Sequence, residues 1–171
     1  SSLREIEGGE VTLASNTTAG VYLLPPIVAR FRESYPQVTL HISILNSQDI
    51  IESTMNWNLD FGLVEGDPSY LPPGLKVTVF AHDELVLVVS PKHHWCGPTA
   101  IKPGMLARNE LLLREQGSGL REVVEQSLLR HGVHVQPLFT LTDNEAIKQM
   151  AMSGVGAAIV SSLSVQRELE K

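Results

Sequence analysis

Residues 38–45, VTLHISIL, alternate apolar and polar side chains, which is the pattern of a β-strand that buries one face. Residues 10–14 show a shorter alternation and predict another strand, and the small polar residues 15–18 predict a turn that opens a helix. Because proline fits only the first turn of a helix, the regular helix is expected to start close to the proline pair at 25–26 and to end at Pro36.

The same alternation of elements continues after residue 45. Asn46 and Ser47 are expected to cap a helix, and residues 60–64, DFGLV, predict a short strand that is buried on both faces. Residues 10–66 therefore predict strand, helix, strand, helix, strand, which is a parallel α/β unit.

The second half of the chain repeats this strand–helix order without a sequence repeat of fixed period. Gly132 is expected to stop one helix, and Thr142 with Glu145 is expected to form the capping box of the next. The expected elements are an extended segment over 75–90 that is broken near 82–84, strands over 107–114, 135–141 and 156–160, and helices over 120–131, 143–153 and 163–171. The sequence thus predicts an α/β fold with two Rossmann-like lobes, 8–82 and 83–171, joined by a hinge near 81–84.

Composition excludes several classes of protein. The chain has 171 residues, 13 Lys and Arg against 19 Asp and Glu, and a net charge of -6, so the chain by itself is not expected to grip a phosphate backbone. Cys96 is the single cysteine, which excludes a disulfide framework and favours a reducing, cytoplasmic location. No apolar run reaches the roughly 18 residues of a membrane span, and residues 1–11 do not read as a signal peptide, so no membrane partner is expected.

Enzyme and metal motifs are not evident in the sequence. There is no phosphate-binding Gly-Lys loop and no dinucleotide fingerprint, and Ser118 lacks the spacing of a nucleophile elbow. His93 and His94 are adjacent, so in an extended loop they are expected to point apart, and no carboxylate stands at ligand spacing. The sequence therefore predicts a solvated loop there, no metal, no cofactor and no catalytic residue.

Two polar turns stand where a ligand would bind in a parallel α/β sheet, beyond the carboxyl ends of strands. One is the turn over 15–18, and the other is the turn over 114–119; each opens a helix and offers free N–H groups that suit a small anion. Helix capping is the competing interpretation of both turns, and the sequence leaves both open. The residues that this argument names are Ser15, Thr17, Thr18, Val64, Glu65, Gly66, Arg114 and Ser118. The Glu65 carboxylate would repel an anion unless Arg114 offsets it or the ligand carries its own proton or amine.

The ordered motifs resemble the effector-binding domain of LysR-type transcriptional regulators. The motifs are Ser15-Asn16-Thr17-Thr18 with Leu24-Pro25-Pro26-Ile27, then Phe31-x-x-x-Tyr35-Pro36, Leu59-Asp60-Phe61-Gly62-Leu63-Val64, Leu85-Val86-Leu87-Val88-Val89-Ser90-Pro91, and Val155-Gly156-Ala157-Ala158-Ile159-Val160. The resemblance covers residues 8–171 and implies the type 2 periplasmic-binding-protein fold, with a small effector in the cleft between two lobes. It implies effector contacts from Ser15, Asn16, Thr17, Thr18, the strand end at Glu65, the turn around Glu115 and Ser118, and Asn144.

The resemblance also implies partners. It suggests a homodimer, and a tetramer in the full-length regulator, that pairs the helix at 24–35 and the strand after it with the helix at 119–131 of a second copy. DNA would be bound only by an N-terminal helix-turn-helix domain, which this chain lacks, and the first lobe is expected to lack its C-terminal closing elements. The expected effector is an inorganic oxyanion or small carboxylate. A transporter's solute-binding protein on the same fold is the alternative, and an enzyme acting on a small acid ranks below it.

Overall fold

The structure is a computed structural model that describes residues 8–97 and 100–169. The chain divides into two compact units, Ser1–Glu65 and Gly66–Lys171. The sequence had placed residues 66–82 with the first lobe, but these residues pack with the second unit. Asp67 and Tyr70 contact Arg130, the residue that follows helix α3 (Gly119–Leu129) of that unit.

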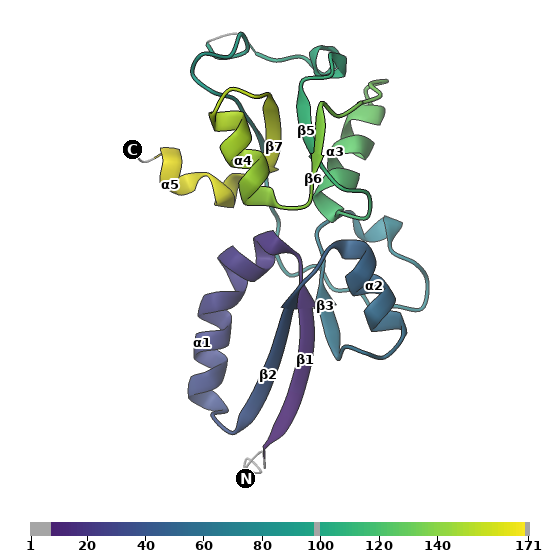
Figure 1. The fold of residues 1–171 in the computed structure, drawn as a ribbon. Helices are drawn as coiled ribbons and strands as arrows, with labels where there is room; N and C mark the ends of the chain where they lie inside the picture. The colour runs from purple at the N-terminus through teal and green to yellow at the C-terminus, as the bar shows by residue number, and fades with distance from the viewer. Residues whose placement is uncertain (1–7, 98–99, 170–171) are drawn as a thin grey trace. The chain divides into compact units, whose positions relative to one another are not determined.

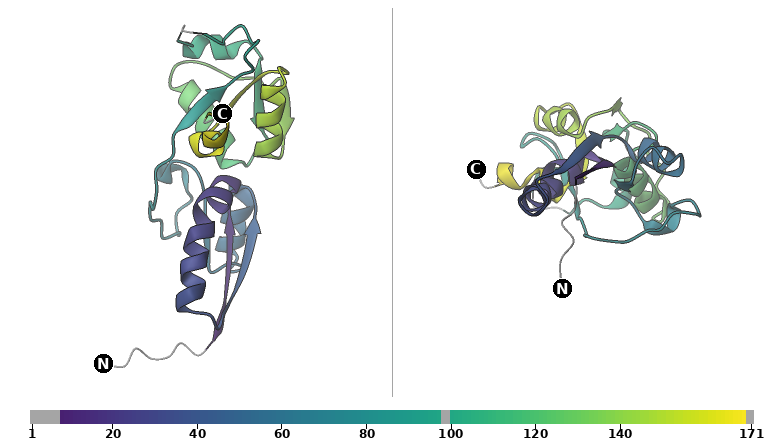
Figure 2. Two further views of the ribbon diagram at one scale, coloured as in Figure 1. Left: turned by 90° about the vertical axis from the view of Figure 1, so that its left-hand side faces the viewer. Right: turned by 90° about the horizontal axis from the view of Figure 1, so that it is seen from below.

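The first unit holds, within the described residues, a parallel sheet of three strands in the order β2-β1-β3. The strands and helices alternate along the chain, and α1 runs alongside the sheet (Figures 1 and 2). The bounds are β1 Gly9–Ser15, α1 Leu24–Ser34, β2 Val38–Ile44, α2 Ser47–Met55 and β3 Phe61–Leu63. The predicted strand–helix–strand–helix–strand order of this unit is therefore confirmed.

Helix α1 begins at the proline pair as predicted, but further helical turns precede it. Thr17 and Thr18 are already helical, and a π-helical turn, Ala19–Leu23, leads into α1. The Leu24 N–H donates to Ala19 O, one residue further back than in an α-helix. The regular α-helix begins at Leu24, so the proline pair lies in its first turn, as the sequence predicted.

The outer strands of the first sheet are less buried than predicted. Phe61 of β3 is 45% exposed, and Ile42 and Ile44 of β2 are 42% and 48% exposed. The prediction of a β3 strand buried on both faces is therefore wrong for this unit. Both strands are edges of the described sheet, so each has a paired neighbour on one side only. The buried core of the unit lies instead over β1, at Leu13 and Ala14, and under α2, at Ile50.

The second unit holds a sheet of four strands in the described residues, in the order β4-β7-β5-β6. β4 is antiparallel to β7, whereas β5 is parallel to both β6 and β7. The bounds are β4 Leu85–Val88, β5 Leu111–Arg114, β6 Phe139–Leu141, α4 Asn144–Met152, β7 Ala157–Ser161 and α5 Gln166–Leu169. The extended segment predicted over 75–90 is a strand only at β4, and the strand predicted over 135–141 is only its last three residues.

Helices cover both faces of this sheet. Leu111 and Leu113 of β5 pack in one apolar cluster with Val124 of α3, and Leu112 packs in another with Ile147 of α4. Successive residues of a strand point to opposite faces, so these two clusters place α3 and α4 on opposite sides of the sheet. Figure 1 shows the same arrangement. Burial on both faces explains why residues 111–114 are all buried.

The stop and start signals of the second unit were only partly predicted correctly. Gly132 has φ 71°, in the left-handed region, and ends the helix as expected. The N-cap of α4 is Asp143, whose carboxylate accepts the Ala146 N–H at 2.8 Å, and not Thr142. Both residues have capping side chains, and the position where the backbone turns selects the second one. Glu145 consequently pairs with Lys148 and Gln149 within the helix.

Candidate functional site

The polar turn of the first unit has N–H groups that no side chain caps. The first intrahelical bond runs from Gly20 N–H to Asn16 O at 2.9 Å, so the N–H groups of Thr17, Thr18 and Ala19 precede the helical ladder. Among the described residues, no side chain forms a cap hydrogen bond at this helix start. Thr18 is buried and Thr17 is half-buried, with no hydrogen bond from its hydroxyl within the described ranges. Capping therefore does not account for these hydroxyls.

Asn16 ties together the ends of all three strands in the described sheet of this unit. Its Nδ2 donates to Leu45 O at 3.0 Å, beyond β2, and its Oδ1 accepts from the Glu65 N–H at 2.6 Å, beyond β3. The same oxygen accepts from the Ser47 hydroxyl at 3.0 Å, at the start of α2. The side chain is 4% exposed and both lone pairs of Oδ1 are used. The contact of Asn16 with an effector stays a prediction. The second hydrogen on Nδ2 is the donor that such a contact would use.

The other predicted residues of the first turn and of the β3 end have distinct roles. Ser15 is fully buried and its hydroxyl donates to Asn16 O at 2.9 Å. Val64 and Glu65 are half-buried, and Gly66, where the second unit begins, has φ 138°. Positive φ favours glycine at that position, so the strand end leaves its sheet by a turn that a side chain would strain.

The turn of the second unit brings three predicted residues into one hydrogen-bonded cluster. Arg114, only 8% exposed, donates from Nη2 and Nε to Glu115 Oε1 at 2.6 and 2.9 Å, and from Nη1 to the side-chain oxygen of Asn144. A buried guanidinium needs such partners, because an unpaired charge is costly away from water. Arg114 therefore forms an ion pair with Glu115. The sequence had suggested Arg114 as the cation that would offset the negative charge of Glu65.

Ser118 caps α3, so the capping interpretation is correct for this second turn. Its hydroxyl oxygen accepts from the Arg121 N–H at 3.4 Å, and its backbone carbonyl accepts from Glu122 N–H at 3.1 Å. The hydroxyl proton is still available as a donor, as are the N–H groups of Gly119 and Leu120, which precede the helical ladder. Ser118 is 3% exposed and sits four residues after Arg114 in the same turn.

Sequence reasoning missed Arg121, which supports this turn. The side chain is buried, donates from Nη1 to Arg114 O at 2.9 Å and pairs with Glu125 at 2.8 Å. A cation in the first turn of a helix opposes the helix dipole, so a structural or binding role could have been inferred from its position alone. The turn thus carries two buried arginines, each paired with a carboxylate, Arg114 with Glu115 and Arg121 with Glu125.

The prediction for the loop that carries the paired histidines is wrong. His93 and His94 do not point apart, because residues 91–95 form turns instead of an extended segment, and the two rings stack with centroids 4.4 Å apart. Both rings contact one carboxylate, Glu110, at 3.1 and 3.3 Å. Glu110 comes from the start of β5, so no spacing near the histidines in sequence could have indicated it.

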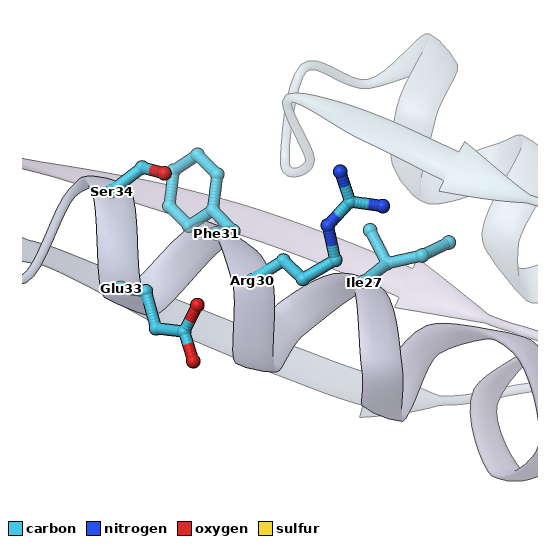
Figure 3. A pocket seen from close by; sticks show the side chains of 5 residues that line it. All are labelled: Ile27, Arg30, Phe31, Glu33 and Ser34. Carbon is cyan, nitrogen blue, oxygen red and sulfur yellow. The ribbon is translucent and has the colours of Figure 1, made fainter.

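Helix α1 carries a shallow hollow on its exposed side. It has a volume of about 310 Å³ and is lined by Ile27, Arg30, Phe31, Glu33 and Ser34 (Figure 3). Ile27 is 52% exposed although its side chain is aliphatic. This surface is the part of the first unit that the resemblance assigned to dimer contacts.

The comparisons with known proteins decide the family. The model of the LysR substrate binding domain matches residues 4–171. This chain belongs to the LysR substrate-binding domain family. The LysR chain resembles the probable RuBisCO transcriptional regulator of Cyanophora paradoxa, 32% identical over 98% of this chain and 53% of that protein. It also resembles the regulator CysL of Bacillus subtilis, 29% identical over 94% of this chain and 53% of that protein. The chain therefore spans about half the length of the curated relatives it matches.

Solved structures agree with this assignment. The Synechocystis PCC6803 CcmR regulatory domain in complex with 2-PG has a TM-score of 0.78 and 28% identity, over 93% of this chain and 74% of that one. The effector binding domain of QuiR in complex with shikimate has a TM-score of 0.82 over 94% of this chain and 77% of that one, and at 18% identity it shows the fold alone. The LysR chain has the mixed α/β, type 2 periplasmic-binding-protein-like fold of these regulatory domains. No helix in the described ranges is long and apolar enough to cross a membrane.

Proposed function

We propose that this LysR chain is the effector-sensing part of a transcriptional regulator and that its effector is a small anion, either an inorganic oxyanion or a short carboxylate. The observation that carries the proposal is the uncapped helix start at Thr17, where three N–H groups and two threonine hydroxyls meet in the absence of any capping side chain among the described residues. The positive end of a helix dipole and free N–H groups favour negative charge.

The second turn supports the same class of ligand. The hydroxyl of Ser118 and the N–H groups that follow it remain available as donors, whereas Arg114 and Arg121 are each paired with a carboxylate. As the family resemblance implies, we propose effector contacts from two stretches, Ser15, Asn16, Thr17, Thr18, Val64, Glu65 and Gly66 in one and Arg114, Glu115, Ser118 and Asn144 in the other. The relative CcmR regulatory domain, which holds 2-PG in its structure, makes 2-PG a rational member of a ligand panel.

The output of the sensor follows from the family. A bound effector can shift a conformational equilibrium only by its difference in affinity for the two states. We infer that this shift acts, within a cytoplasmic homodimer, on DNA binding by another part of the regulator, and that the chain itself does no catalysis. The relatives are transcriptional regulators by name, so they favour this function over solute binding for a transporter.

Thermal denaturation of the full-length regulator tests the proposal. The panel contains sulfate, phosphate, short carboxylates and 2-PG. A ligand at 100 times its Kd adds about 2.7 kcal/mol, which raises the Tm by roughly 5–10 °C for a domain of this size. We expect such a shift with at least one anion, and its loss in Thr17→Val and in Ser118→Ala.

Two matched variants separate ligand contacts from folding effects. Thr12→Val removes a threonine hydroxyl from the same strand–helix unit at a position outside the predicted site. Asn46→Ala removes an N-cap that accepts the Asp49 N–H at 3.0 Å, as Ser118 caps α3. Both controls should keep the full ligand shift. A regulator that shows no shift with any anion, or whose shift survives Thr17→Val and Ser118→Ala, would show that the effector is not an anion held by these turns.

A further inference from the structure

His93, His94 and Glu110 form a cluster of metal-ligating side chains apart from the effector residues. Nε2 of His93 lies 3.1 Å from one carboxylate oxygen of Glu110, and Nε2 of His94 lies 3.3 Å from the other. One ligand atom from each of the three residues lies within 4.8 Å of the others. Such a group of two imidazoles and one carboxylate is the donor set that Zn²⁺ and Cu²⁺ prefer in proteins.

The spacing of the donors suits a tetrahedral ion. Zn²⁺ holds nitrogen and oxygen ligands at about 2.0–2.2 Å, which puts neighbouring ligand atoms roughly 3.3–3.5 Å apart. The two distances from the histidine nitrogens to Glu110, 3.1 and 3.3 Å, are close to this value, and all three ligand atoms lie within 4.8 Å of one another. The side chain of His93 is 9% exposed and that of Glu110 is 25% exposed, whereas that of His94 is 58% exposed. The exposed side at His94 gives access to solvent and a place for a water ligand.

The backbone holds the three residues in place. The His93 N–H donates to Ser90 O at 2.9 Å and the Cys96 N–H donates to His93 O at 2.8 Å, which fixes the turn. Glu110 O accepts the Ala157 N–H at 2.8 Å, which fixes the start of β5 against β7. A site whose ligands are positioned before the ion arrives loses less conformational entropy on binding.

One hydrogen bond has to change when an ion binds. The Trp95 N–H donates to His93 Nδ1 at 3.1 Å, so neutral His93 carries its proton on Nε2 and donates to Glu110. Coordination needs the lone pair of Nε2, so the proton moves to Nδ1, and the bond from the Trp95 N–H breaks. The exchange makes the site weaker than a structural zinc site and makes the Trp95 amide a direct reporter of metal binding.

We propose that His93, His94 and Glu110 bind a divalent transition metal ion, Zn²⁺ or Cu²⁺, at the amino end of β5. The predicted effector residue Arg114 stands at the other end of the same strand, four residues away, or roughly 13 Å along an extended chain. Loss of the metal site therefore leaves the effector turns intact, and the two functions can be tested separately.

The fluorescence of Trp95 measures the binding. The ring of Trp95 lies edge-on to both imidazoles, with centroids 5.0 and 5.4 Å away, and the only other tryptophan in the sequence is Trp57. In the Trp57→Phe form of this 171-residue chain, without an affinity tag, paramagnetic Cu²⁺ should quench Trp95 saturably, and Zn²⁺ should compete with it. We expect His94→Ala and Glu110→Gln to raise the Kd at least tenfold.

Matched variants decide where the ion binds. His41→Ala removes an exposed histidine that also lies near a carboxylate, at 3.9 Å from Glu10, and it should leave the Kd unchanged. Cys96→Ser removes the single thiol of this chain and should also leave the Kd for the metal ion unchanged. Addition of Zn²⁺ should shift the Trp95 amide resonance in the parent protein and not in His94→Ala. Quenching that persists in His94→Ala, or that disappears in Cys96→Ser or His41→Ala, would overturn the proposal.

Discussion

Asn16 Oδ1 accepts a hydrogen bond from the backbone N–H of Glu65 at 2.6 Å, across 49 residues of sequence. With its bonds to Leu45 and Ser47, the Asn16 side chain joins the ends of β1, β2 and β3 at the edge where the first polar turn lies. The same residue thus lies in the predicted effector turn and holds the strands that position it. A residue of this kind sets the geometry of a site whether or not it touches the ligand.

Replacing Asn16 should therefore be destabilising. Asn16→Ala leaves Leu45 O, the Ser47 hydroxyl and the Glu65 N–H without their partner, and each buried unsatisfied group costs about 1–3 kcal/mol. Since these costs are not additive, we expect a loss of roughly 2–4 kcal/mol in the free energy of unfolding, measured by urea denaturation. Gln48→Ala, which removes an exposed side-chain hydrogen bond to Glu52, is the control and should change stability by less than about 0.5 kcal/mol. An Asn16→Ala protein as stable as the parent would show that the hydrogen bonds of Asn16 do not stabilise this unit.

Trp57 offers a stabilising substitution. It has φ 59° after the end of α2, where the Trp57 N–H donates to Thr54 O and the Asn58 N–H donates to Ser53 O. This is the helix-ending motif in which glycine is favoured, because a side chain is strained in the left-handed region. The indole is 93% exposed, so its removal costs little packing. Trp57→Gly should raise the stability by roughly 0.5–1 kcal/mol, measured by thermal and urea denaturation; a loss of stability would show that the indole makes contacts that its exposure does not suggest.

Lys148 should make stability depend on pH. Burial lowers the pKa of Lys148, but hydrogen bonds to Glu145 and Glu168 outweigh it and raise the pKa overall, while the hydrogen bond from Lys148 lowers the pKa of Glu145. Because the pKa of Lys148 is raised, its contribution to the stability of the fold is complete below the unfolded lysine pKa of about 10.4 and is lost as the pH rises through the folded pKa. Because the pKa of Glu145 is lowered, its contribution is complete above the unfolded glutamate pKa of about 4.3 and is lost as the pH falls through the folded pKa. The ion pair is therefore fully formed between about pH 5 and pH 10.

Lys148→Met tests this pH window. At pH 7 the variant should be less stable by roughly 1–3 kcal/mol, because the carboxylates lose their partner and Ser164 O loses its 2.8 Å hydrogen bond. The difference from the parent protein should narrow as the pH falls from 5 to 3, since the carboxylates then become neutral. A difference in the free energy of unfolding that is constant from pH 7 to pH 3 would rule out the ion pair as its cause.

Ile27 provides a test of dimer formation. Ile27 is 52% exposed at the hollow on α1 shown in Figure 3, which the family resemblance assigns to contact with a second copy. Ile27→Asp places a charge at this surface, and burying a charge in a dimer contact costs much free energy. The Kd of the dimer of the full-length regulator should therefore rise at least tenfold, measured by light scattering over a concentration series. Met55→Asp, at a 48% exposed position on α2, is the control. Equal association in both variants and the parent would place the dimer contact elsewhere.

Most elements of the fold were predictable because local patterns specify them. Alternation in residues 38–45 predicted β2, Asn46 caps α2 through the Asp49 N–H, and Gly132 ends α3 as its left-handed conformation requires. The errors have a common cause, which is that neighbouring residues offer equivalent local signals. Thr142 and Asp143 are both good caps, and the small polar residues over 15–18 predicted a turn although Thr17 and Thr18 are already helical.

The candidate site was predictable in part for the same reason. The turns after β1 and β5 could be found because parallel strands end at one edge of their sheet. In the structure Arg114 is hydrogen-bonded to Glu115 and Asn144, and the contact of these residues with an effector stays a prediction. Whether a polar side chain in a turn is free or engaged could not be predicted. The first helix start is uncapped in the described chain, whereas Ser118 caps α3, and both turns look alike in sequence.

The sequence by itself determined the family, the order of strands and helices, and the two polar turns, since hydrophobic period and turn chemistry are local properties of a chain. Only the tertiary structure decided that Asn16 binds Leu45 and Glu65, and that Glu110 meets His93 and His94. These contacts join segments that are distant in sequence, and their distances depend on how strands pair and helices pack. No local pattern encodes such a distance, because it is set by the packing of the whole unit.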